Sequence, residues 1–330
     1  MPHRVDARDM TGIARPPLDT VYRRRENDGE PVNDRRLRRM IDTGDIVRIA
    51  PGSFADRVEW SALTPIARHA QCVWEASARM KRGQVFSHFA AAALHGIDIL
   101  GTWPSSIDVS IATSSGGRSS GSVRRHSRDL GTVALTLWGD HAVTTPLQTS
   151  VDLIAAMRFM DAVAVADQAL WAKRPGGALV DQASLLAAAT DRRGRGAARA
   201  ERAAQFSTPL ADSVRESQSR VIIAGQGFPA PELQAHFRLS DGSDVYTDFF
   251  WREHRHIGEF DGAGKYRDPA LLRGRTPEQA LLAEKDREDE LRRQVFAFSR
   301  WRTPALVRPQ RLYDILRAAG LPTERPRPGS

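Results

Sequence analysis

The spacing of apolar residues predicts a mixed α/β chain that begins with a short helix and a hairpin. A helical pattern runs through Arg35–Ile41 and stops at Thr43-Gly44, where glycine supplies the left-handed residue on which many helices end. Two strand patterns follow at 46–49 and 53–55, joined by a Pro-Gly turn. We expect a recognition helix and wing of a winged helix-turn-helix in residues 1–62.

The middle of the chain, residues 63–200, mixes both periodicities. Helices are expected over 63–80, 87–96 and from 144 to 154, and strands over 106–112 and 133–138. A Ser/Gly-rich run at 113–122 is expected to be flexible, and the Arg- and Ala-rich stretch 191–202 to form a solvated linker helix. This region is interpreted as one α/β module.

The last third, residues 205–330, changes to a clearer pattern. A helix over 212–224 precedes strands over 233–239, 244–251 and 256–261, with Asp241-Gly242 as a hairpin turn. A charged amphipathic helix over 276–296, a strand over 298–301 and a closing helix over 309–319 complete it. Helix, three-stranded meander, helix and strand is the order of an α/β sandwich.

The hairpin of this last domain brings acidic residues together. If Trp251 faces His256, then Phe249 opposes Gly258 and Asp248 opposes Glu259. Opposed side chains share a sheet face about 4.5–5.5 Å apart. Asp261 points the same way as Glu259, because strand side chains alternate. Three carboxylates on one face predict a site for a divalent cation such as Mg²⁺, which prefers oxygen ligands and can activate water against a phosphodiester.

Two further residues were weighed for this site. Glu216, on the preceding helix, is either a fourth acid of the cluster or a surface residue, and Lys265 is either a cation at the site or a surface lysine. The alternative for the whole cluster is a set of solvent-facing acids on an open sheet face. The neighbouring apolar aromatic residues argue against that alternative.

These residues resemble the PD-(D/E)XK nuclease core, in which Asp248 is followed eleven positions later by Glu259. The segments that also resemble very-short-patch-repair-like endonucleases are Pro229–Gln234, Glu259-Phe260-Asp261-Gly262, Asp286–Leu291 and Phe298–Trp301. The resemblance covers residues 205–320. It implies that Asp248 and Glu259 are metal ligands and Glu216 a supporting acid. Asp261 stands where the motif has its lysine, which favours binding over cleavage, with Lys265 as a substitute cation.

The first half resembles the AbiEi-type antitoxins of type IV toxin–antitoxin systems. The segments that carry this resemblance are Arg36–Phe54, Phe86–Gly96 and Val143–Leu153. The resemblance implies a winged helix-turn-helix that binds operator DNA, an antitoxin-type α/β module and a cognate nucleotidyltransferase-like toxin as partner.

The basic helix fits contact with double-stranded DNA. Arg35, Arg36, Arg38 and Arg39 place four guanidiniums on one short helix, where some would meet phosphates and others guanine edges. Arg48 lies on the first wing strand, where a phosphate or minor-groove contact would fall. The alternative is a solvated basic face balanced by nearby aspartates.

Charge and composition are consistent with a polyanionic partner but do not identify one. The chain has 48 Lys plus Arg against 40 Asp plus Glu, a net charge of +8, and most of its cations are arginine, which favours bidentate contacts to phosphate or carboxylate. Its single cysteine excludes a disulfide framework and a cysteine-based zinc site. No signal peptide and no apolar run of about 20 residues is found, so a cytoplasmic protein without a membrane partner is expected.

Several polar residues of the middle region are interpreted as structural. Ser87 is expected to cap a helix, and His88 and His95 to be core or surface histidines, because no nucleophile and acid stand nearby in the sequence. Asp108 is expected to be an ordinary strand residue and Asp152 a structural acid.

Three functions remain open from the sequence. The first is a non-catalytic, DNA-binding transcriptional regulator of the antitoxin type, and the second a metal-dependent endonuclease targeted by its N-terminal module. The third is an interaction scaffold of a defence system. The replacement of the motif lysine by Asp261 favours the regulator.

Overall fold

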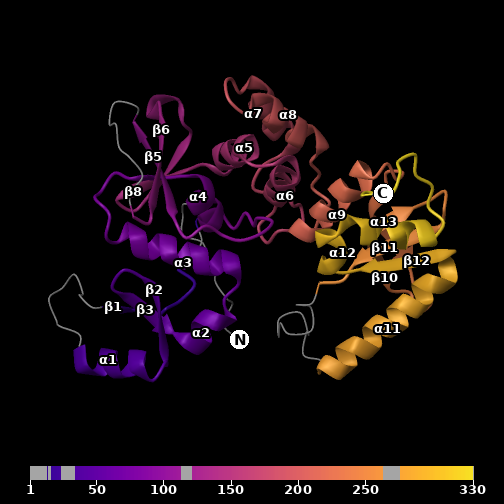
Figure 1. The fold of residues 1–330 in the computed structure, drawn as a ribbon, viewed down its shortest axis with the longest axis horizontal. Coiled ribbons are helices and arrows are strands. Elements are labelled where there is room, and N and C mark those ends of the chain that lie inside the picture. The colour runs from indigo at the N-terminus through magenta and orange to yellow at the C-terminus, as the bar shows by residue number, and fades with distance from the viewer. Residues whose placement is uncertain (1–12, 14–15, 24–33, 113–120, 263–275, 330) are drawn as a thin grey trace. The chain divides into compact units, whose positions relative to one another are not determined.

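The structure, a computed structural model, describes residues 13, 16–23, 34–112, 121–262 and 276–329 of the chain (Figure 1). The chain forms two compact units, 1–169 with 179–205 and 170–178 with 206–330. Residues 1–62 and 63–200 were expected as separate domains. In this division both belong to the first unit, except for residues 170–178, which belong to the second. Both units mix helices with sheets, as expected for a mixed α/β chain.

The first unit begins with a small sheet and a helix. The sheet has the order β1-β3-β2, with β1 at Tyr22–Arg23, β2 at Ile46–Ala50 and β3 at Ser53–Asp56. Helix α1 spans Asp34–Asp42, and Gly44 follows it with φ +78°. Leu37 of α1 packs with Ile46 and Phe54 of the two hairpin strands in a small apolar core. The expected helix, glycine, strand, turn, strand order is confirmed.

A buried acid ties this sheet to the next helices. Helix α2 spans Arg57–Ala62 and α3 spans Pro65–Ser77. Glu75 of α3 accepts hydrogen bonds from Arg23 Nη2 at 2.7 Å and from Ser53 Oγ at 2.8 Å, although its side chain is almost fully buried. Because a buried carboxylate is stable only when paired, this contact fixes the small sheet against α3.

The first unit also contains a five-stranded sheet of order β6-β5-β4-β8-β7. Its strands are Val85–Phe86 (β4), Ile107–Ala112 (β5), Val123–Arg128 (β6), Leu135–Trp138 (β7) and His141–Thr144 (β8). The expected strands at 106–112 and 133–138 are present. The other three were not expected, because β4 and β8 are short and β6 reads Val-Arg-Arg-His-Ser-Arg, without an apolar alternation.

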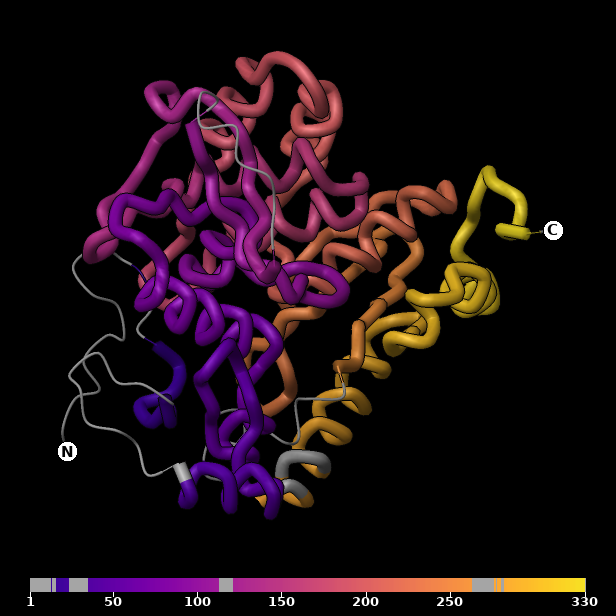
Figure 2. Tube along the Cα trace, turned by 60° about the vertical axis from the view of Figure 1, so that its left-hand side comes forward, coloured from indigo at the N-terminus to yellow at the C-terminus, as the bar shows by residue number. Residues whose placement is uncertain are grey.

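Helices lie between and after these strands along the chain. They are α4 (His88–His95), the short 3₁₀ turn Leu130–Thr132, α5 (Pro146–Ala156), α6 (Phe159–Leu170), α7 (Gln182–Asp191) and α8 (Ala197–Phe206). The prediction of one solvated linker helix over 191–202 is wrong. The chain leaves the helical conformation after Asp191 and resumes it at Ala197, and the small Ala200, Ala203 and Ala204 are buried. The Cα trace in Figure 2 shows these helices as tight coils.

The second unit has the predicted order of helix, three-stranded meander, helix and strand. Its elements are α9 (Val214–Gly225), β9 (Glu232–Arg238), β10 (Asp244–Trp251), β11 (His256–Phe260), α11 (Pro277–Gln294), β12 (Ala297–Trp301), α12 (Thr303–Val307) and α13 (Pro309–Ala318). The sheet order is β12-β11-β10-β9, with β9, β10 and β11 antiparallel. Strand β12 pairs parallel to β11, so α11 is the crossover between them.

The two faces of this sheet have different cores. Phe250 and Ile257 pack with Leu291 of α11 on one face. On the other, Trp301 Nε1 donates to Ser219 Oγ of α9 at 2.9 Å, and Phe249 packs against the Trp301 ring. Gly258 lies under this ring, since a Cβ there would come within 2.7 Å of Trp301 Cη2. Glycine is therefore required for the close approach of β11 to the tryptophan.

None of the helices within the described ranges combines the length and the apolar content needed to cross a bilayer.

Candidate functional site

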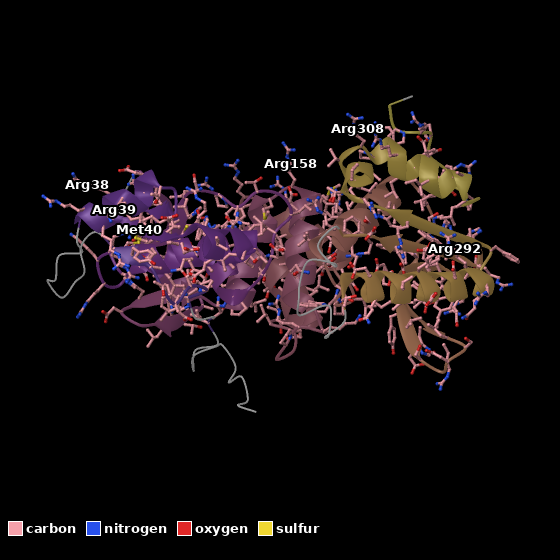
Figure 3. The ribbon with its side chains drawn as sticks, turned by 90° about the horizontal axis from the view of Figure 1, so that it is seen from below. Arg38, Arg39, Met40, Arg158, Arg292 and Arg308 are labelled. Carbon is pink, nitrogen blue, oxygen red and sulfur yellow. The ribbon has the colours of Figure 1, made fainter. Side chains whose placement is uncertain are left out.

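The arginines of α1 lie on a helix that is anchored by buried Leu37, with Met40 and Ile41 partly buried against the same core. Leu37 is 2% exposed, whereas Arg35, Arg36, Arg38 and Arg39 are all exposed. Figure 3 shows the side chains of Arg38 and Arg39 pointing outward from the helix. Buried Leu37 fixes the rotation of α1, so its remaining surface is basic on more than one face.

The hairpin next to α1 adds one more guanidinium. Arg48 lies on β2 opposite Phe54 of β3 and is exposed. Its Nε donates to the carbonyl oxygen of Ala50 at 3.4 Å, a weak contact within its own strand. The predicted DNA-binding residues thus all lie on two adjacent elements of the first unit, α1 and the β2–β3 hairpin.

In the second unit, the predicted register of β10 with β11 is confirmed for three residue pairs, but not for the next pair, Asp248 and Glu259. Trp251 pairs with His256, Phe250 with Ile257 and Phe249 with Gly258. Regular pairing ends there. Asp248 instead accepts a hydrogen bond through Oδ2 from the backbone N–H of Phe260 at 2.8 Å.

The pairing of β10 with β9 is also irregular at this level. Its register includes Thr247 with Ala235 and Phe249 with Leu233, and Gln234 of β9, between these two, has φ +52°. A non-glycine residue with positive φ disturbs the regular strand geometry at this level. The expected direct opposition of Asp248 and Glu259 assumed an undisturbed strand.

Glu259 belongs to an ionic cluster with α11 and β12. Arg287 Nη2 lies 2.9 Å from Glu259 Oε1, and Arg300 Nη2 lies 3.1 Å from Glu259 Oε2. The same two guanidiniums also contact Glu284, and Arg300 contacts Glu288 at 2.9 Å. We call these five residues, Glu259, Glu284, Glu288, Arg287 and Arg300, the Glu259 cluster. Burial by itself would lower the pKa of Arg287. The hydrogen bonds and charges of Glu284 and Glu259 outweigh burial and raise this pKa above its ordinary value, so the guanidinium stays charged.

Asp261 also has a cation of its own. Its carboxylate, 8% exposed, accepts from Arg302 Nε at 2.7 Å and lies 2.6 Å from Arg302 Nη2. Arg300 and Arg302 are two residues apart, as are Glu259 and Asp261, which agrees with the expected alternation of these two acids. Lys265, the predicted substitute cation, lies outside the described residues.

Glu216 is close to Asp248. Burial, and next the charge of Asp248, raise the pKa of Glu216 from its ordinary 4.5 to about 8. Its two oxygens accept from Asp212 N at 2.8 Å and Ser213 Oγ at 2.9 Å. Of the four predicted acids, Glu216 and Asp248 are thus near each other, whereas Glu259 and Asp261 are held by arginines.

This arrangement does not fit the Mg²⁺ site that the sequence suggested. Both oxygens of Glu259 accept from Arg287, and Arg302 occupies an oxygen of Asp261. In the described ranges, no three His, Cys, Asp or Glu side chains are grouped so that they could hold a metal ion. Arginine, rather than a cation from solution, neutralises these carboxylates.

A second group of chemically active side chains lies in the first unit and was not predicted as a site. It surrounds a cavity of about 950 Å³ beside the edge strand β6, which we call the β6 cavity. Its lining comprises His88, Arg124, Arg125, His126, Ser127, Arg128, Asp152, Ala155, Ala156, Arg192, Arg195 and Arg199. The sequence signals are the basic run 124–128, which carried no prediction, and the Arg-rich stretch 192–199, which was interpreted as part of a linker helix some 65 residues away.

The structure alters the interpretation of Ser87 and His88. Ser87 occupies the N-cap position of α4 without capping it, and its hydroxyl contacts Ser110 Oγ and His88 Nδ1, both at 3.0 Å. His88 has φ +48° and stacks on His126 with ring centroids 3.7 Å apart. His95 is structural, as expected, with Nε2 2.7 Å from the carbonyl oxygen of Thr144.

The two aspartates of this region are buried and paired. Asp108 of β5 is fully buried, and its Oδ1 lies 2.8 Å from His126 Nε2. Asp152 contacts Arg128 at 2.5 Å and Arg192 at 3.5 Å, which makes it the structural acid that was expected.

Comparison with known proteins finds two mycobacterial relatives. The uncharacterized proteins MT2308 and Rv2248 of Mycobacterium tuberculosis are each 30% identical to this chain over 134 residues, which is 40% of the chain. The aligned part is 48% of each relative, so the chain spans about half the length of the curated relatives it matches. No family model and no solved structure matches the chain.

Proposed function

We propose that this protein is a DNA-binding transcriptional regulator of the antitoxin type. The observation that carries the proposal is the presentation of α1. Leu37 is buried in the small core and Met40 and Ile41 pack partly against it. Four arginines of the helix stay exposed, beside a β-hairpin that carries Arg48. Guanidiniums on a short helix next to a wing suit phosphate contacts with direct readout of guanine.

The antitoxin role and a nucleotidyltransferase-like toxin as partner are supported by the resemblance to AbiEi-type proteins in 36–54, 86–96 and 143–153. Residues of the last segment form β8 and the start of α5. In this proposal, the module that would bind operator DNA lies in the same unit as the α/β module that carries the other two segments.

The first test is selection of bound sequences from a random double-stranded DNA library by the full chain. Binding of the selected DNA by the wild type is then compared with the double variant Arg35→Gln/Arg39→Gln across a salt series. Each phosphate contact contributes about 0.9 to the slope of log K against log salt, so we expect the slope to fall by about 2 and binding to weaken at least tenfold.

The matched control is Arg82→Gln, which removes a guanidinium that is 86% exposed elsewhere in the same unit. It should leave affinity and slope unchanged. Equal binding by the wild type and the α1 double variant, or an equal loss in the control, would refute DNA contact by α1.

A metal-dependent DNA endonuclease is the second candidate. Two observations favour it: the α9-β9-β10-β11-α11-β12 order expected from the PD-(D/E)XK resemblance, and the proximity of Glu216 and Asp248. The arginine partners of Glu259 and Asp261 speak against it. With Glu259 and Asp261 paired to arginines, the carboxylates as arranged do not form a metal site for catalysis.

Plasmid nicking separates the two candidates. Purified full chain is incubated with supercoiled DNA and Mg²⁺, Mn²⁺ or EDTA, beside the variants Asp248→Asn and Glu232→Gln. If the regulator proposal is right, DNA stays intact in all lanes and still binds. Metal-dependent nicking that Asp248→Asn abolishes and Glu232→Gln retains would establish the endonuclease instead.

A further inference from the structure

The β6 cavity is built where the polar side of a sheet edge faces helices. In the parallel pair β5–β6, Asp108 is the register partner of Arg124 and Ser110 that of His126. The alternate residues Ile107 and Val109 belong to the apolar core of the unit. The same two strands therefore give one apolar face and one polar face, and the polar face is completed by residues of α4, α5 and the α7–α8 connection.

Positive charge is in excess in this cavity. Six arginines line it, and Asp152 is the one acid of its lining. Asp152 is shared between Arg128 and Arg192, while Asp108 behind the cavity lies 3.9 Å from Arg124 Nε. Within the described ranges, Arg195 has no carboxylate partner. A concave site lined by one sign of charge focuses the field and raises the local concentration of ions of the opposite sign.

Some of these guanidiniums are held in place by uncharged or shared partners. Arg199 Nη1 donates to the carbonyl oxygens of Ala155 and Ala156, both at 3.3 Å, at the C-terminal end of α5. Arg192 Nε is buried without a hydrogen-bond partner in the described part of the chain. Arginines oriented in this way keep donors for planar, bidentate contact with phosphate.

The two histidines add a rigid aromatic element to the basic lining. The rings of His88 and His126 are stacked at 13° to each other, and the Asp108 carboxylate fixes the edge of His126. Burial, and next the charge of His126, lower the pKa of His88 to about 3, so its ring is neutral. The positive φ of His88 is a backbone conformation that costs about 1–3 kcal/mol and is found mostly at functional sites.

We propose that the β6 cavity binds a free nucleotide, with its phosphates on the arginines of β6 and the α7–α8 connection and its base beside the histidine stack. Phosphate matches the excess of guanidiniums, and a flat base matches the imidazole and guanidinium planes. A volume of about 950 Å³ accommodates a small ligand rather than a duplex. The proposal uses no residue of α1 or the hairpin and stands independently of DNA binding.

The test is isothermal titration calorimetry of the full chain with each of the four ribonucleoside triphosphates, with tripolyphosphate and with the four nucleosides. We expect at least one triphosphate to bind at micromolar concentration, tripolyphosphate at least tenfold more weakly, and nucleosides not at all. The double variant Arg124→Gln/Arg195→Gln should weaken the triphosphate at least thirtyfold.

Arg193→Gln is the matched control. Arg193 lies in the same connection as Arg195, but its guanidinium bonds to the carbonyl oxygen of Thr190 and does not line the cavity. Its substitution should change the affinity less than threefold. The circular dichroism spectrum should be the same for all three proteins.

Four outcomes would overturn the proposal. Absence of triphosphate binding at 1 mM, or equal loss in the control and double variants, removes the site. Equal affinity for tripolyphosphate makes it a general anion site. A 5′-phosphorylated single-stranded oligonucleotide that binds more tightly than every triphosphate, and competes with them, assigns the cavity to strand ends.

Discussion

Arginine gathers in two regions of this molecule, the β6 cavity and the Glu259 cluster, with opposite consequences. In the Glu259 cluster, Arg287 and Arg300 meet three glutamates at distances of 2.9–3.1 Å. In the β6 cavity, six arginines line a space whose one lining acid, Asp152, pairs with Arg128 and Arg192. The first region is neutralised from within the chain, whereas the second retains an excess of positive charge.

The difference shows that the number of arginines does not identify an anion site. The Glu259 cluster contains one acid of the motif that predicted a metal site, Glu259, yet that acid is paired with two arginines of the chain. The β6 cavity contains no recognised motif, yet its lining carries more guanidiniums than carboxylates. The local balance of acid and base, which follows from packing, separates a structural ionic network from a binding site.

The largest effect is expected from Arg287→Gln, which leaves the buried carboxylate of Glu259 with one fewer cation. Removing one partner of a buried ion pair costs about 3–5 kcal/mol. We expect hydrogen–deuterium exchange of the β11 and β12 amides to show this loss of local stability. Arg252→Gln is the control, because Arg252 pairs with Glu232 at the surface and should cost less than about 1 kcal/mol. Equal effects of the two variants would contradict the structural role of the cluster.

A smaller effect with a distinctive pH dependence is expected at Glu216, the acid whose described partners are all uncharged donors. Its pKa in the folded chain, about 8, lies above the ordinary 4.5, so it is protonated at neutral pH. Its contribution to stability is therefore fully present below about pH 4.5 and is lost as the pH rises through 8.

The variant Glu216→Gln keeps the shape of the protonated acid and cannot ionise. At pH 9 we expect it to unfold with a free energy higher than the wild type by on the order of 2 kcal/mol, and at pH 5 to match the wild type. Urea unfolding at both pH values measures the difference. The same difference at both pH values would show that Glu216 is not protonated in the folded chain.

The smallest effect on stability is expected in the β6 cavity, from Arg195→Gln. The substitution removes one of several like charges and breaks no described ion pair. Its free energy of unfolding should stay within about 0.5 kcal/mol of the wild type, as is usual for exposed positions. Thermal unfolding in low-phosphate buffer is the measurement. A decrease of more than about 1 kcal/mol in the free energy of unfolding would show that Arg195 belongs to a structural network like that of Arg287. It would contradict the difference between the two regions.

Short-range pattern was sufficient to predict much of the second unit. Strand β10 has the predicted bounds, and its register with β11 follows from the hairpin turn alone, as the pairing of Trp251 with His256 confirms. The same counting does not extend one residue further, to Asp248, whose Oδ2 accepts a hydrogen bond from the backbone N–H of Phe260. A contact of this kind is not visible in the sequence of the hairpin turn.

The sequence by itself determined the secondary structure wherever a residue's preference is local: the glycine that ends α1 and the αβββαβ order of the second unit. Only the tertiary structure decided which charges are neutralised. Arg287 and Arg300 reach Glu259 from 28 and 41 positions away, and Arg192 reaches Asp152 from 40. Electrostatic interactions depend on distance in space and on burial, and neither quantity is encoded by neighbours along the chain.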